Sequence, residues 1–126
     1  MDKVNVEILA TAYLKIIIQK FGRSKYHKTT PYLNIDDSPY SDYMDESLGA
    51  EYVVSDNEII IYWKNIKDLE DLIKTLLHEY THYLQSPTWI ARYYKIGYDY
   101  ITHPYEQEAI LAERHWKKIQ NADTKF

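Results

Sequence analysis

Two histidines and a glutamate stand at a spacing that can bind a metal ion and put it to use. His78, Glu79 and His82 belong to the stretch His-Glu-Tyr-Thr-His. Because an α-helix turns by about 100° per residue, side chains four positions apart point in nearly the same direction, so both imidazoles can meet one ion. Zinc accepts imidazole nitrogen, and a catalytic site keeps three protein ligands and one open position. The spacing therefore predicts Zn²⁺ on His78 and His82.

Glu79 follows the first histidine directly, so its carboxylate leaves a helix beside the expected ion rather than on it. A carboxylate in that position can take a proton from an attacking water and deliver it to a leaving amine. We therefore expect Glu79 to be a general base. The alternative is two surface histidines flanking a solvated glutamate on an amphipathic helix, which requires no metal.

A third ligand has to come from another part of the chain. Downstream lies His-Pro-Tyr-Glu-Gln-Glu-Ala, and Pro104 suits the first turn of a helix. Glu106 and Glu108 flank the expected buried face of that helix on opposite sides, so the spacing leaves either carboxylate open as the ligand. Either could equally be a carboxylate favoured by the helix macrodipole, with no metal involved.

A resemblance to a known family bears on this choice. An H-E-x-x-H helix followed by E-x-x-A near the start of the next helix resembles the glutamate-ligand zincins (gluzincins), above all the minimal metalloproteases of the ImmA/IrrE type and small phage-encoded relatives. The resemblance covers roughly residues 50 to 120. In those proteins the glutamate three residues before the alanine binds zinc, which corresponds here to Glu106 before Ala109. Ile110 departs from the Asn or Asp frequent in that family, and Leu111-Ala112 replaces Phe-Ala.

The resemblance implies a fold and an activity. The fold is α+β and zincin-like, with an N-terminal helix, a small sheet or hairpin, the H-E-x-x-H helix and a C-terminal helix bearing the glutamate. The implied activity is hydrolysis of peptide bonds in a protein or peptide substrate, with Zn²⁺ as cofactor. Two departures, at Ile110 and at Leu111-Ala112, affect substrate and subfamily more than the metal site.

Several other side chains qualify for supporting roles. A tetrahedral intermediate needs a hydrogen-bond donor for its oxyanion, and the candidates near the third ligand are His103, Tyr98, Tyr100 and Tyr105. Each is also explained as a packing aromatic residue. Glu113 could orient a metal-bound histidine, although an exposed carboxylate is the simpler interpretation.

A second function of another class stays open. Four protein ligands would close the zinc site, and the chain would then be a non-catalytic protein-interaction module on the same scaffold, with structural or absent zinc. The candidates for a fourth ligand are His103, Glu108 and His115. Glu79 favours the enzyme, because a purely structural site has no use for it.

The chemistry depends on a helix that presents both histidines. Residues 68 to 85 carry apolar side chains at spacings of three and four, Asp68 or Asn65 can cap the start, and Pro87 ends the segment. A second helix is predicted over 4 to 21 with a stop at Gly22, and a third from Pro104 to about 120. Runs at 50 to 54 and 58 to 63 with a turn at 55 to 57 predict a β-hairpin.

Two segments carry no assigned element. Residues 23 to 49 show no sustained period and are expected to be irregular. Residues 88 to 103 are aromatic, with Gly97 marking a break, and no helix or strand is assigned there.

The whole chain sets outer limits on function. Its 126 residues fit a single domain over 1–126, and the lack of cysteine excludes disulfides, thiolate ligands and cysteine nucleophiles. A net charge of −4 gives no electrostatic footprint for nucleic acid or an anionic membrane. The sequence has no secretory signal and no apolar run long enough to span a membrane, so a cytoplasmic location is expected.

Overall fold

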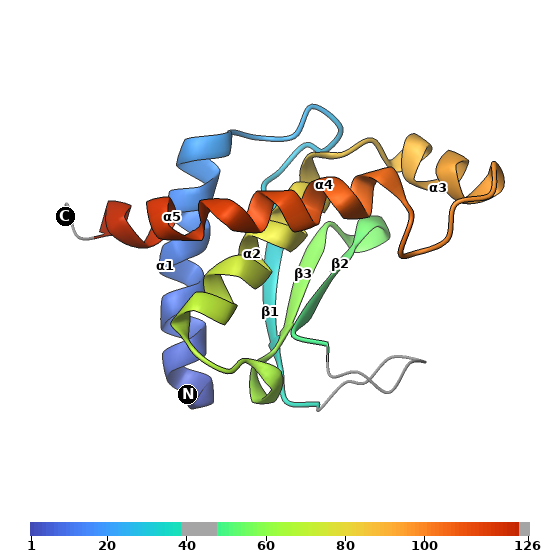
Figure 1. Ribbon diagram of the computed structural model, residues 1–126. Coiled ribbons are helices and arrows are strands. Elements are labelled where there is room, and N and C mark those ends of the chain that lie inside the picture. The colour runs from blue at the N-terminus through green and yellow to red at the C-terminus, as the bar shows by residue number, and fades with distance from the viewer. Residues whose placement is uncertain (39–47, 124–126) are drawn as a thin grey trace.

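The computed structural model describes residues 1–38 and 48–123 and has an α+β fold (Figure 1). The elements in chain order are α1 (Lys3–Phe21), β1 (Tyr32–Asp36), β2 (Ala50–Val53), β3 (Glu58–Tyr62), α2 (Leu69–Leu84), α3 (Pro87–Lys95), α4 (Pro104–Ala112) and α5 (Trp116–Asp123). Short 3₁₀ turns occupy Val54–Asp56, Trp63–Asn65 and Glu113–His115.

The helix α2 begins and ends for local reasons. Asp68 caps it, since its carboxylate accepts a hydrogen bond from the backbone N–H of Asp71 at 2.9 Å. At the other end Pro87 disfavours a helical conformation for Ser86, which is extended with φ −70° and ψ 119°. The prediction of a helix over 68 to 85 is confirmed.

Three strands form the sheet in the order β1-β3-β2, so β3 lies in the centre. β2 pairs antiparallel with β3, with Ala50 opposite Ile61, and the turn between them ends at Asn57 with a left-handed φ of 49°. This hairpin was predicted. β1 pairs parallel with β3 and lies within the segment expected to be irregular, so that expectation is wrong over Tyr32–Asp36; residues 39–47 of the segment lie outside the described residues.

The C-terminal part differs from the single predicted helix. A 3₁₀ turn at Glu113–His115 divides it into α4 and α5. Ala112, Glu113 and Trp116 all keep right-handed helical dihedrals, so the two helices follow one another across the molecule, as Figure 1 shows. The 3₁₀ bonding tightens the chain without breaking its direction. Ahead of α4, helix α3 occupies part of the segment to which no element was assigned.

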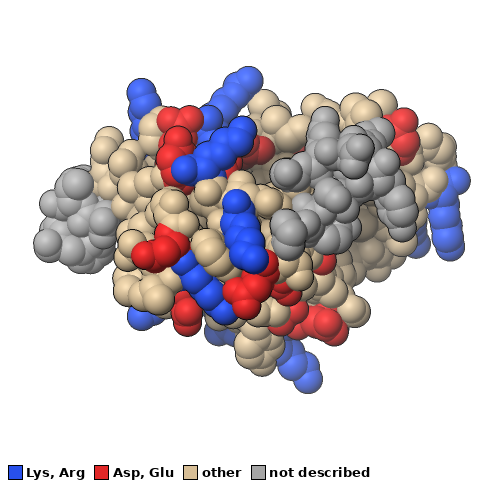
Figure 2. Space-filling view, turned by 90° about the horizontal axis from the view of Figure 1, so that it is seen from below, with Lys and Arg blue, Asp and Glu red and all other residues tan. Residues whose placement is uncertain are grey.

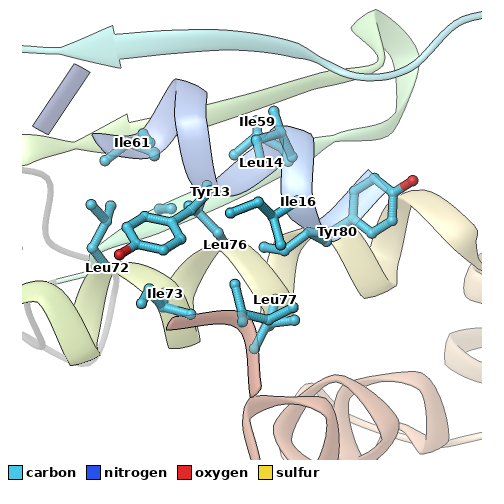
Figure 3. Packing of buried hydrophobic residues seen from close by; sticks show 14 of the residues in the cluster. Tyr13, Leu14, Ile16, Ile59, Ile61, Leu72, Ile73, Leu76, Leu77 and Tyr80 are labelled. Carbon is cyan, nitrogen blue, oxygen red and sulfur yellow. The ribbon is translucent and has the colours of Figure 1, made fainter. Parts of the chain in front are cut away.

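The core joins α1, the sheet, α2 and α5. Side chains from α1, β3 and α2 meet in one cluster (Figure 3), and the most deeply buried aliphatic side chains are Val6, Ile17, Ile59, Ile61, Leu72, Ile73, Leu76, Leu77 and Ile119. α2 contacts α1, β2, α4 and α5. The helix that carries the histidines is therefore held on several sides.

The distribution of surface charge and the length of the helices can be compared with the expectations for nucleic acid and membranes. Acidic and basic side chains are interspersed on the face shown in Figure 2. None of the helices in the described parts of the chain has the length and apolar character needed to cross a membrane.

Candidate metal centre

Both imidazoles of α2 face the carboxylate of Glu106 on α4. The Nε2 atom of His78 lies 2.6 Å from Oε1 of Glu106, and the Nε2 atom of His82 lies 3.0 Å from Oε2. His78, Glu79 and His82 also offer three ligand atoms within 4.8 Å of one another, so this group could hold a metal ion. The structure thus brings together all four side chains singled out by the sequence.

The start of α4 determines which of its glutamates faces α2. Glu106 lies in the first turn, is 7% exposed and points at the histidines, whereas Glu108 is exposed. Pro104 opens the helix, and His103 caps it by accepting a hydrogen bond from the backbone N–H of Tyr105. Of the two carboxylates that spacing left open, only Glu106 reaches the imidazoles.

The outer nitrogens of the two imidazoles are also occupied. Nδ1 of His78 lies 2.9 Å from Oε2 of Glu113, and Nδ1 of His82 lies 2.8 Å from Oε1 of Gln85. Glu113 therefore contacts a histidine, and the simpler interpretation of it as an exposed carboxylate is wrong. Gln85 was not foreseen, although its spacing of three residues from His82 is a signal that could have pointed to it.

The hydrogen-bond partners of the two imidazoles show what else their nitrogens require. A neutral imidazole carries one N–H and one acceptor nitrogen. His78 and His82 each face oxygen acceptors on both nitrogens, from Glu113 or Gln85 on one side and from Glu106 on the other. Such surroundings are satisfied either by a second proton on each ring or by a cation shared at the Nε2 side. The donor set of two imidazoles and one carboxylate suits zinc.

The charges of the three groups are coupled. Burial alone would lower the pKa of His78, but hydrogen bonds to Glu106 and Glu113 outweigh it and raise the pKa to about 10. Burial likewise opposes the charge on His82, yet the bond to Glu106 and the nearby Glu79 raise its pKa. Burial would raise the pKa of Glu106, but the bonds from both histidines hold it well below its usual range. The site therefore favours a carboxylate anion facing positive charge.

Glu79 lies on the same helix in a different environment. Its side chain is 7% exposed, and burial raises its pKa to about 7 in spite of the two histidines, which act to lower it. It lines a pocket of about 170 Å³ together with His78, Tyr100 and Glu113. The rest of the pocket wall is formed by Leu48, Gly49, Ala50, Asp71, Lys74 and Thr75. A carboxylate with a pKa near neutrality can both accept and return a proton.

The aromatic candidates separate clearly. The hydroxyl of Tyr100 donates to Oε1 of Glu106 at 3.2 Å, and Tyr100 lines the pocket beside Glu79. His103 is buried with both ring nitrogens engaged, one at the backbone of Tyr105 and the other 3.0 Å from the carbonyl of Ile90. The rings of Tyr98 and Tyr105 both pack against Tyr93.

The three candidates for a fourth ligand lie elsewhere. His103 caps α4, Glu108 is exposed, and the ring of His115 packs 5.8 Å from the ring of Phe21. None of them joins the cluster formed by His78, His82 and Glu106.

Comparison with known proteins adds no relative to these observations. No family model, no curated protein and no solved structure matches the chain. The candidate metal centre therefore stands on its own geometry: a His-Glu-x-x-His helix that could bind a metal ion, faced by one further carboxylate.

Proposed function

We propose that this chain is a zinc-dependent peptidase of the gluzincin type, with a zincin-like fold. His78, His82 and Glu106 hold Zn²⁺, and Glu79 is the general base. The observation that carries the proposal is the convergence of both Nε2 atoms on one buried carboxylate while both Nδ1 atoms already face other acceptors. A divalent cation satisfies all of these groups at once.

The residues of the chain divide the reaction between them. When bound, zinc supplies a Lewis acid that polarises a carbonyl and acidifies water. Glu79, buried in the pocket wall with a pKa of about 7, takes the proton of the attacking water and delivers it to the leaving amine. Tyr100 lines the same pocket, and its hydroxyl proton, which Glu106 accepts in this structure, would turn to the oxyanion that develops on the former carbonyl oxygen.

The proposal is tested by removing the base while keeping the ligands. Glu79→Gln should bind zinc like the parent and lose about 10²–10⁴-fold in peptide hydrolysis, because the amide cannot accept the proton. The measurement is cleavage of a degenerate library of internally quenched peptides, with zinc content determined on the same samples.

Glu70→Gln is the matched control. It makes the same change on the same helix, at an exposed glutamate that pairs with Lys74. It should cleave at the parental rate. If Glu79→Gln hydrolyses as fast as Glu70→Gln, Glu79 is not the base.

A further inference from the structure

Gln85 connects the two helices that supply the donor set. It is 5% exposed and follows directly after α2. Its Oε1 lies 2.8 Å from Nδ1 of His82, and its Nε2 donates to the backbone carbonyl of Tyr105 at 3.0 Å. One amide thus touches a histidine of α2 and the residue immediately before Glu106 on α4.

We propose that Gln85 is a positioning residue that fixes His82 and Glu106 relative to each other, presenting Nε2 of His82 toward the shared ion. The inference rests on the zinc site proposed above and extends it. Gln85 itself touches neither the ion nor a substrate; it acts through His82 and through the backbone of α4.

The orientation of the amide determines which nitrogen of His82 carries the proton. A carbonyl only accepts, so the group facing the Tyr105 carbonyl has to be the Gln85 NH₂. The Gln85 oxygen is then left facing Nδ1 of His82, which has to be an N–H to bond with it. With Nδ1 protonated, a neutral His82 keeps its lone pair on Nε2, on the side of Glu106.

The same amide helps to fix the backbone ahead of Glu106. The N–H of Tyr105 donates to Nδ1 of His103 at 3.1 Å, and its carbonyl accepts from Gln85. Nε2 of His103 in turn lies 3.0 Å from the Ile90 carbonyl on α3. The first turn of α4 is therefore held from two neighbouring segments, and this turn aims the Glu106 carboxylate.

The end of α2 explains why this residue is available. Gln85 is extended, with φ −84° and ψ 158°, and its N–H still bonds the carbonyl of His82. The following Ser86 is also extended because Pro87 restricts it. The chain leaves the helix at the point where a side chain can reach both His82 and α4.

Two substitutions separate the two contacts. Gln85→Leu keeps the approximate size and removes both hydrogen bonds, whereas Gln85→Glu keeps an acceptor for His82 and removes the donor to Tyr105. Gln107→Leu is the matched control, since the Gln107 amide also donates to a backbone carbonyl, that of Ile101 at 2.7 Å, without touching an imidazole.

The first readout is zinc affinity, measured by competition with a chromophoric chelator. We expect Gln85→Leu to weaken zinc binding 10–100-fold, the range typical of partners that orient metal-bound histidines. Gln85→Glu should weaken it several-fold, and Gln107→Leu should leave it unchanged. Parental affinity in both Gln85 variants would overturn the proposal.

The second readout does not depend on zinc. In ¹⁵N-histidine-labelled protein treated with chelator, the Nδ1–H resonance of His82 should be protected from solvent exchange in the parent and in Gln85→Glu, and should exchange rapidly in Gln85→Leu. Equal protection in all three proteins would contradict the role of Gln85. Circular dichroism checks that each variant is folded. Should Gln85→Leu not fold, the zinc affinity of Gln85→Glu against the parent still tests the contact with Tyr105, and rapid exchange of the His82 Nδ1–H in the parent would still contradict the contact with His82. A chain that binds no zinc yet shows this protection pattern would refute the peptidase and leave the Gln85–His82 contact standing.

Discussion

At the level of single side chains, the two oxygens of Glu106 are divided between two imidazoles, one oxygen to each. A carboxylate used in this way is a ligand candidate rather than a capping group, because a first-turn carboxylate that only serves the helix dipole has no need to face a histidine pair. Tyr100 adds a donor to one of the same oxygens. The position of Glu106 therefore decides more about the site than the His-Glu-x-x-His motif does alone.

Glu106→Gln tests this assignment. The amide loses the negative charge and one of the two acceptor oxygens, so zinc affinity should fall by on the order of 100-fold or more, beyond the loss typical of outer partners. Equilibrium competition with a chelator measures the change. Glu108→Gln is the control, since Glu108 is exposed on the same helix. The zinc affinity of the Glu108→Gln protein should equal that of the parent. A larger loss in Glu108→Gln would mean that α4 offers a different ligand.

Much of the candidate site could be predicted from the sequence, because its key pair is local. His78 and His82 are four residues apart in a strongly amphipathic helix, and this spacing alone sets their direction. The choice between Glu106 and Glu108 depends on how α4 packs on α2, which no local spacing encodes. The contacts of Gln85 and Glu113 with the histidines likewise arise from side chains that meet only in the folded chain.

At the level of elements, a helix or strand could be predicted from the sequence when the residues that determine it lie within it or directly beside it. α2 has its cap, its apolar period and its terminating proline within its own sequence, and the β2–β3 hairpin has its turn between the strands. β1 owes its existence to parallel pairing with β3, where Tyr32 lies opposite Glu58, and its five residues alternate too briefly to stand out. α3 carries start signals of its own, since Ser86 caps it and Pro87 stands in its first turn, so it could have been predicted, although none of its residues is fully buried.

The C-terminal end of α1 allows a sharp stability prediction. Gly22 has φ 77° and ψ −176°, a region that is essentially restricted to glycine, and a Cβ built there meets no atom within 4 Å. Gly22→Ala should therefore lower the free energy of unfolding by roughly 1–3 kcal/mol through backbone strain alone. Urea unfolding followed by circular dichroism measures it. Lys20→Ala is the control, at an exposed position of the same last turn, and it should lower the free energy of unfolding far less. If both substitutions lower it equally, the loss does not come from the backbone dihedrals of residue 22.

At the level of the whole molecule, the proposed ion would join parts of the chain that are remote in sequence. His82 and Glu106 lie on helices separated by α3 and by the segment that follows it. A ligand that binds only the folded chain stabilises it by mass action, by about 2.7 kcal/mol at a hundredfold excess over its Kd. Metal binding and global stability should therefore be linked.

Zinc should accordingly raise the midpoint of thermal unfolding by on the order of 10 °C at that excess, for a domain of this size. Differential scanning calorimetry with and without zinc measures the shift, and chelator should reverse it. The Glu106→Gln protein should show little of the shift, while Glu108→Gln should show all of it. If the midpoint of thermal unfolding of the parent protein is the same with and without zinc, the chain does not bind the ion.

The two faces of α2 have a consequence for how substitutions in this helix act. One face of its 16 residues fills the core through Leu72, Leu76 and Tyr80, and the other presents the imidazoles. Packing and the placement of the imidazoles depend on one helix, so a substitution that shifts α2 in the core also moves His78 and His82. Under the proposed function, substitutions at the interior positions of α2 would therefore alter metal binding as well as stability.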